Sequence, residues 1–143
     1  MYAQLNVTGR AIKVGALTIT GTFAGEMEPT DRVSEEETPG VWCADGSVFF
    51  EYRGREYSQD FSAAWFDDGT LDYWDDDASL KVYSESDGGM IEATGAECAA
   101  IERAANGPAA LHMAILSAQR AAAEAAKADA LAFLKQCTKE GEA

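Results

Sequence analysis

The chain has 143 residues, of which 47% are hydrophobic and 25% charged, and its net charge at neutral pH is −14. These values are typical of one globular domain with a buried core, and they argue against disorder caused by excess charge. No run approaches the roughly 18 to 20 apolar residues that span a bilayer, and the first residues lack the basic and apolar segments of a signal peptide. We therefore expect a single domain over residues 1–143, located in the cytoplasm and without a membrane partner.

The first 25 residues have the alternation of strands with one buried face. Leu17, Ile19 and Phe23 share one side of the expected strand, and threonines lie between them. Shorter apolar pairs at positions 5–7 and 12–14 predict one or two earlier strands. This end of the chain should therefore begin an antiparallel sheet.

Residues 26–40 break this alternation with two prolines and three consecutive glutamates, so we expect a long solvated loop there. From residue 41 to about 93, short runs of aromatic and β-branched residues are separated by turn-forming residues. The expected turns are Asp45-Gly46, Gly54, Asp68-Gly69, Asp75-Asp76-Asp77 and Asp87-Gly88-Gly89. The pattern predicts an antiparallel meander or small open barrel, with about six to eight short strands in the whole β-rich part, residues 1–93.

The period then changes to that of helices over residues 94–143. Thr94 and Glu97 have the spacing of a capping box, which predicts a short helix that ends at Asn106-Gly107. Pro108 is suited to the first position of a second, long helix that reaches about Thr138. The predicted fold class is therefore α+β, with an N-terminal antiparallel sheet followed by one short and one long C-terminal helix rich in alanine.

The excess negative charge is confined to the middle of the chain. Residues 1–25 carry a net charge of +2, residues 26–97 carry −16, and residues 98–143 carry 0. Acidity that served solubility alone should be spread along the chain, so we interpret this segment as a surface that occupies a basic site on a partner. Solubility remains the competing explanation.

The sequence thus predicts a small non-enzymatic binding or inhibitor protein whose partner is a basic protein or nucleoprotein complex. The most specific form of this hypothesis is a nucleic-acid mimic of the phage anti-defence or anti-CRISPR type, acting in the host cytoplasm. Carboxylates would make the electrostatic contacts and nearby aromatic residues would anchor the interface. The expected contact residues are Glu35, Glu36, Glu37, Asp67, Asp68, Asp72, Asp75, Asp76, Asp77, Trp65, Tyr73 and Trp74.

A second hypothesis comes from the alanine-rich helix. A stretch with so few bulky side chains allows close approach of a neighbouring element, either the chain's own sheet or a second copy of the helix. In the latter case the protein would be a homo-oligomeric structural or assembly protein, for example a homodimer. Its interface would contain Leu111, Ile115, Ala122, Ala126 and Phe133.

A third hypothesis is a divalent-metal-dependent hydrolase that uses the acid cluster Asp67–Asp77. Hard cations require several oxygen ligands, but Ser79 and Leu80 occupy positions where an EF-hand would carry an acid and a glycine. We therefore expect no metal site. Paired catalytic carboxylates would have to converge in a cleft, whereas these acids are expected in solvated turns.

Other classes of site find little support. His112 is the only histidine and Cys43, Cys98 and Cys137 lack metal-ligand spacing, so we expect a histidine at the helix surface or core edge and reduced cysteines. Glycine-rich nucleotide motifs and nucleophile motifs are missing, which predicts no cofactor. Arg53 and Arg55 are too few for direct binding of nucleic acid.

Overall fold

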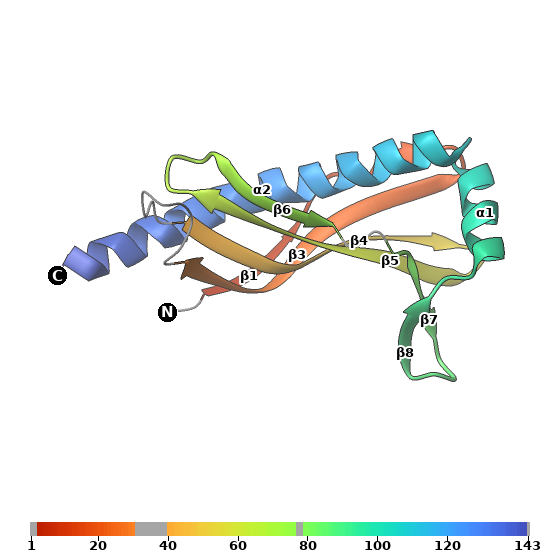
Figure 1. The fold of residues 1–143 in the computed structure, drawn as a ribbon, viewed down its shortest axis with the longest axis horizontal. Helices are drawn as coiled ribbons and strands as arrows, with labels where there is room; N and C mark the ends of the chain where they lie inside the picture. Colours follow the sequence, from red (N-terminus) through yellow and green to blue (C-terminus); the bar gives the residue numbers. More distant parts are fainter. Residues whose placement is uncertain (1–2, 31–39, 77–78, 143) are drawn as a thin grey trace.

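The structure, a computed structural model, describes residues 3–30, 40–76 and 79–142. It is an α+β fold in which one long helix lies across one face of a large antiparallel sheet (Figure 1). The strands are β1 (Ala3–Thr8), β2 (Ile12–Val14), β3 (Leu17–Thr30), β4 (Gly40–Tyr52), β5 (Arg55–Phe66), β6 (Leu71–Asp76), β7 (Lys81–Ser84) and β8 (Gly89–Glu92). The helices are α1 (Gly95–Ala104) and α2 (Pro108–Glu142). The predicted fold class and order of elements are confirmed.

Three strands dominate the sheet. The strands β3, β4 and β5 are consecutive antiparallel neighbours of 14, 13 and 12 residues. Each outer edge of this central unit is shared by two shorter strands: β1 and β2 pair with β3, while β6 and β7 pair with β5. The sheet is therefore open, and its central strands are much longer than the short strands expected from the sequence.

Two segments expected to be loop or turn are strand instead. Residues 26–30 continue β3, so the predicted loop over residues 26–40 is wrong for that part, and residues 31–39 lie outside the described chain. The expected turn at Asp45-Gly46 is a register shift within β4, where a β-bulge lets the strand continue. A Cβ at Gly46 would lie 2.6 Å from the Phe23 ring, so the residue that resembled a turn signal makes room for a core side chain.

The helices begin and end for the reasons that the sequence indicates. The Thr94 hydroxyl accepts a hydrogen bond from the Glu97 backbone N–H at 3.1 Å, and the Glu97 carboxylate accepts one from the Thr94 N–H at 3.0 Å. This reciprocal capping box starts α1. Pro108 starts α2, as expected, and the helix extends four residues beyond Thr138, to Glu142.

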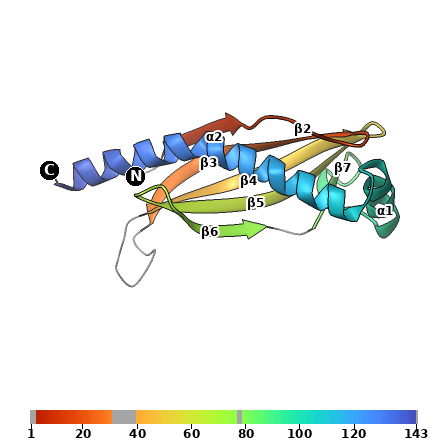
Figure 2. The same cartoon turned by 90° about the horizontal axis from the view of Figure 1, so that it is seen from above.

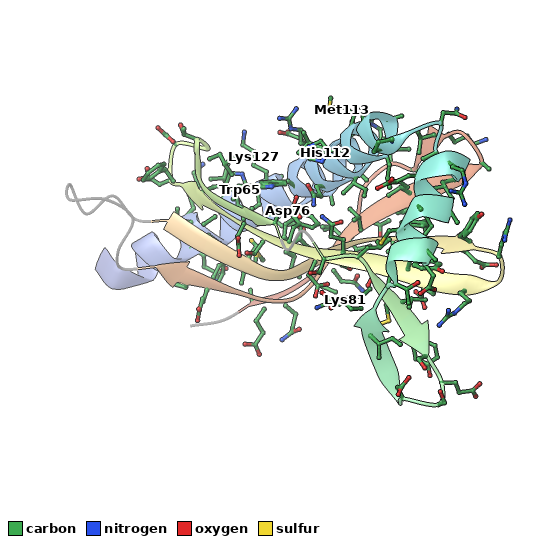
Figure 3. All side chains as sticks on the ribbon, turned by 45° about the vertical axis from the view of Figure 1, so that its right-hand side comes forward. Trp65, Asp76, Lys81, His112, Met113 and Lys127 are labelled. Carbon is green, nitrogen blue, oxygen red and sulfur yellow. The ribbon has the colours of Figure 1, made fainter. Side chains whose placement is uncertain are left out.

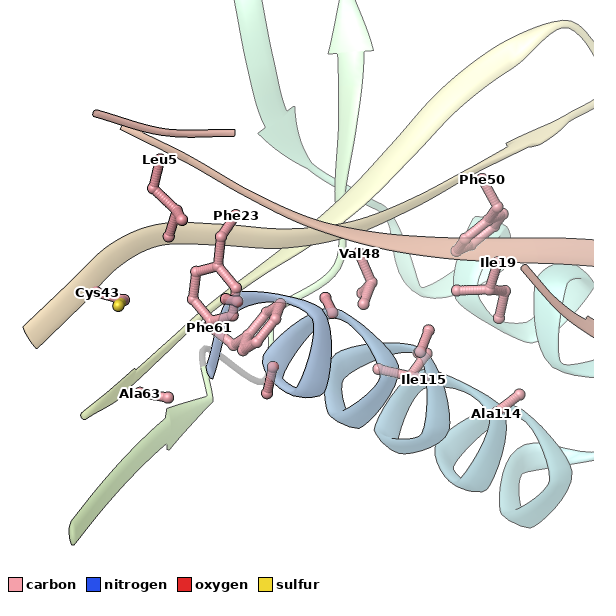
Figure 4. Close-up of a cluster of buried hydrophobic side chains, with 14 of the residues drawn as sticks. Leu5, Ile19, Phe23, Cys43, Val48, Phe50, Phe61, Ala63, Ala114 and Ile115 are labelled. Atoms are coloured by element: carbon pink, nitrogen blue, oxygen red, sulfur yellow. The ribbon is translucent and has the colours of Figure 1, made fainter. Parts of the chain in front are cut away.

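The hydrophobic core lies between α2 and the sheet face that it covers, which we call the inner face (Figures 2 and 4). Alternate residues of the strands point to this face, and residues three and four apart on α2 meet them. Bulky contributions come from Phe23, Phe50, Phe61 and Trp65 on the sheet and from Phe133 on the helix. The Phe23 and Phe61 rings are in edge contact, with centroids 4.9 Å apart.

Small residues bring the middle of α2 directly onto the sheet. A Cβ at Gly21 of β3 would lie 2.5 Å from the Ala118 carbonyl oxygen and 3.0 Å from the Ala122 Cβ. A Cβ at Gly9, in the loop after β1, would lie 2.6 Å from the Ala122 backbone nitrogen. The alanines of α2 and these glycines therefore form one close contact, which is the intramolecular alternative that the alanine-rich sequence allowed.

Candidate functional site

The sheet face opposite α2, which we call the outer face, carries a concentration of carboxylates. The alternation of the strands places these side chains outward, and all of them are exposed. In the described part of the chain, the outer-face carboxylates of β3–β6 are Glu26, Glu28, Glu51, Glu56, Asp60 and Asp75. Neither of the two helices that the structure describes lies over this face in Figures 1 and 2.

Positive charges on the outer face are few. Lys13 of β2 lies opposite Thr18, and the Lys81 Nζ of β7 lies 3.7 Å from Asp60 Oδ2. Glu51 and Glu56 face each other directly across β4 and β5, an arrangement of like charges that disfavours strand pairing. The summed field of this face is therefore negative, and the arrangement of its charges does not serve stability.

Two rows of mostly polar residues cross the middle of the outer face. Thr20, Phe49, Ser58 and Lys81 form one row across four strands, and Thr22, Ser47 and Asp60 form the next. Most of these side chains are short hydroxyls, while Phe49 is a partly buried aromatic residue. The face thus combines exposed carboxylates with short polar side chains.

The acid cluster expected from the sequence is divided between separate places. Asp67 and Asp68 lie at the turn between β5 and β6, where hydrogen bonds from Thr70 lower the pKa of Asp68. Asp75 points to the outer face, whereas Asp76 points to the inner face, and neither lies in the expected turn. Asp72 and Tyr73 lie on β6, but their side chains are outside the described structure, as are Asp77 and Glu35 to Glu37 entirely.

Asp76 is tied into the interior. Its Oδ1 accepts hydrogen bonds from Gln59 Nε2 at 2.8 Å and from Gln119 Nε2 of α2 at 3.0 Å. Gln119 is fully buried, and its Oε1 has no hydrogen-bond partner within the described structure. Asp76 therefore joins the sheet to the helix and is a structural residue of the core edge rather than part of the acidic surface.

A hollow of about 270 Å³ adjoins Asp76 and is lined by side chains from α1 and α2, including Cys98, Glu102 and the exposed His112 (Figure 3). Burial, which acts together with Glu102, raises the pKa of the Cys98 thiol, and burial raises the pKa of Cys43 to about 12. Both cysteines are free thiols. Within the described ranges, no three His, Cys, Asp or Glu side chains are grouped so that they could hold a metal ion.

The two expected tryptophan anchors lie on the helix side of the sheet. Trp65 is buried next to Phe23, with ring centroids 6.3 Å apart, and Trp74 stacks on Phe61 at 5.3 Å. Both tryptophans line a pocket of about 490 Å³ between α2 and the β5–β6 hairpin. The structure therefore separates these aromatic residues from the outer-face carboxylates with which the sequence analysis grouped them.

The residues expected at an oligomer interface are buried against the chain's own sheet. All five have exposed fractions of 9% or less: Leu111, Ile115, Ala122, Ala126 and Phe133. This face of α2 is thus occupied within one chain. An oligomer formed through the helix would have to use its opposite face.

Most of the outer-face carboxylates were not among the expected contact residues. Glu26, Glu28, Glu51, Glu56 and Asp60 are isolated in the sequence and do not form a visible cluster. Because side chains alternate between the two faces along each of β3, β4 and β5, the strand register is needed to show that these carboxylates share one face.

Comparisons of the chain with protein-family models, with curated proteins and with solved structures found no match. In the part of the chain that the structure describes, none of the helices has the length and apolar character needed to cross a membrane.

Proposed function

We propose that this protein is a non-enzymatic binding protein whose outer face docks on a basic surface of a partner. The observation that carries this proposal is the set of outer-face carboxylates, which lie exposed on a sheet face without a covering helix and with two lysines beside them. Electrostatic complementarity of this kind accelerates association and selects among partners.

The spacing of the carboxylates favours a partner that normally binds nucleic acid. Two pairs of outer-face carboxylates are closely spaced: Glu26 and Glu28, two residues apart on one strand, stand about 7 Å apart, and Glu51 and Glu56, opposite each other on neighbouring strands, stand about 5 Å apart. Surfaces that bind phosphates carry clustered lysines and arginines with similar short separations. An inhibitor that occupies such a surface, including one of the phage anti-defence type, would need a broad acidic face and no catalytic residues.

A pair of charge-matched variants tests this proposal. The outer-face variant carries E26Q, E28Q, D60N and D75N, while the control variant removes four exposed acids elsewhere through E85Q, D87N, E124Q and D129N. Each protein is used as bait in bacterial lysate, and captured proteins are identified and then challenged with DNA and RNA. We expect the unmodified protein and the control variant to retain a basic nucleic-acid-binding partner that nucleic acid displaces, and the outer-face variant to lose it.

Binding should also weaken as salt is raised, because exposed charges are screened. Equal capture by the outer-face and control variants would show that net charge, rather than this face, governs binding. Capture that neither DNA nor RNA displaces would contradict a nucleic-acid-binding site as the target.

A further inference from the structure

The pocket between α2 and the β5–β6 hairpin, which we call the tryptophan pocket, has the dimensions of a small-molecule site. Its volume of about 490 Å³ lies within the range of clefts that hold small ligands. One wall comes from the sheet and the turn after β5, and the other comes from successive turns of α2. The lining includes Trp65, Leu71 and Trp74 on the sheet side and Arg120, Glu124 and Lys127 on α2.

The floor and the sheet wall of the tryptophan pocket are apolar. Trp65 is held at the base by its contact with Phe23, and Trp74 is fixed by stacking on Phe61. At the mouth of the pocket, the Leu71 side chain is 48% exposed. Covering it would be favourable, because burial of a leucine side chain lowers the free energy. A ligand with an apolar body would cover Leu71 and the open side of Trp74 without a rearrangement of the core.

The helix wall adds positive charge to this apolar site. Arg120, Glu124 and Lys127 are spaced four and three residues apart, so they follow one side of α2 along the pocket. No ion pair joins Arg120 or Lys127 to a carboxylate in the described part of the chain. The described residues of the lining therefore carry a net charge of +1, within a protein whose net charge is −14.

The turn after β5 holds Lys127 close to the pocket. A Cβ at Gly69 would lie 3.3 Å from Lys127 Cε and 3.8 Å from its Nζ, so this glycine leaves room for the lysine stem. Trp65 and Lys127 come from the two walls and lie near each other where the hairpin meets the helix (Figure 3). An ammonium group is thus placed beside an aromatic floor.

We propose that the tryptophan pocket binds an amphipathic monocarboxylate, with its aliphatic or aromatic body between the tryptophans and Leu71 and its carboxylate on Arg120 or Lys127. The guanidinium of Arg120 can form two parallel hydrogen bonds to a carboxylate, whereas Lys127 supplies a point charge. Glu124 disfavours ligands with additional negative charge. The site lies on the helix side of the sheet, so it does not depend on the function proposed for the outer face.

Calorimetric titration with three ligands of equal chain length tests the chemistry of the site. We expect the intact protein to bind octanoate at least tenfold more tightly than octanol, because a charge-assisted contact adds to the shared apolar contact, and to bind octylammonium more weakly than either. Quenching of tryptophan fluorescence should accompany octanoate binding. Equal affinity for octanoate and octanol, or no octanoate binding at millimolar concentration, would overturn the proposal.

Two variants with equal charge locate the site. The pocket variant R120Q/K127Q should bind octanoate about tenfold more weakly, while R103Q/K135Q, which removes two exposed cations outside the pocket lining, should bind it as the intact protein does. L71N, at a half-exposed position, should weaken octanoate and octanol binding by a similar factor of several-fold. Unchanged octanoate affinity in folded R120Q/K127Q or in L71N would place binding elsewhere and overturn the assignment.

Discussion

The two faces of the sheet differ in their surroundings: the inner face packs against α2, whereas the outer face carries exposed carboxylates. On the inner face, glycines and alanines allow backbone-to-backbone approach of α2, and the inward carboxylate of β6, Asp76, receives hydrogen bonds from two amides. On the outer face, Asp60 lies 3.7 Å from the Lys81 ammonium, while like charges face each other at Glu51 and Glu56. The hydrophobic core therefore lies on the inner face, and the exposed carboxylates of the outer face contribute little to the free energy of folding.

The largest loss of stability is expected from a substitution at Gly21, where the inner face meets α2. In G21A the new methyl group would meet the Ala118 carbonyl oxygen at 2.5 Å, so either α2 must move away from β3 or the strand must distort. Overpacking of this kind against backbone atoms should lower the free energy of unfolding by about 3 kcal/mol. Urea denaturation followed by circular dichroism measures the change.

Gly89 of β8 provides the matched control for Gly21. A Cβ at this strand glycine would meet nothing within 4 Å, so G89A should change the free energy of unfolding by less than about 0.5 kcal/mol. If G21A and G89A unfold at the same urea concentration, the close contact between α2 and the inner face does not support the fold as described.

A second, smaller effect compares neighbouring carboxylates on opposite faces. D76A removes the acceptor shared by Gln59 and Gln119 and leaves the buried Gln119 amide without a partner, which should cost about 2 kcal/mol of stability. D75A removes an exposed carboxylate from the outer face and should cost less than about 0.5 kcal/mol. Thermal unfolding of the two variants measures the difference.

The variant D76N separates the contribution of the carboxylate charge from that of the hydrogen bonds. In D76N the side-chain carbonyl oxygen can replace Oδ1 and accept both hydrogen bonds, but these bonds lose the assistance of the carboxylate charge, so the stability of D76N should lie between those of D76A and the intact protein. Equal destabilisation by D75A and D76A would mean that the two faces do not differ in this respect, and that Asp76 does not join α2 to the sheet.

Much of the fold follows from local sequence. The alternation around Leu17 and Ile19 predicts the buried face of β3, and the capping box and Pro108 predict where both helices begin. The sequence did not indicate the length of β3, because residues 26–30 precede a proline- and glutamate-rich stretch that is typical of a loop, or the length of β4, because Asp45-Gly46 has the composition of a turn. Only the Phe23 ring, which is distant in sequence, explains why this dipeptide forms a bulge instead.

The candidate site was less accessible to sequence reasoning. Adjacent acids suggest one cluster, yet successive residues of a strand point to opposite faces, so Asp75 and Asp76 have different surroundings. The tryptophans share a stretch of sequence with these acids but share a pocket with Arg120 and Lys127, some fifty residues away. Long-range register decides such groupings, and composition does not report it.

The smallest change in stability is expected at Glu97 of α1, a carboxylate that accepts hydrogen bonds from Thr94, Tyr57 and Arg55. Its pKa is held below the ordinary value of 4.5 by the hydrogen bond from the Thr94 N–H, together with the Tyr57 hydroxyl at 2.9 Å and the Arg55 guanidinium at 2.8 Å. Because the folded pKa is the lower one, ionised Glu97 stabilises the fold above about pH 4.5, and this contribution is lost as the pH falls through the lowered pKa. E97Q should therefore be less stable than the intact protein at about pH 7, and the difference should shrink at about pH 3.

Glu56 provides the charge-matched control for this pH dependence, because its outer-face carboxylate lies opposite Glu51. E56Q relieves a pair of like charges, so at about pH 7 it should be at least as stable as the intact protein. Urea denaturation at both pH values distinguishes the two positions. A stability difference for E97Q that stays constant from neutral to acidic pH would mean that the hydrogen bonds to Glu97 do not depend on its charge. Asp76 would then be the remaining carboxylate, among those compared, whose hydrogen bonds are expected to stabilise the fold.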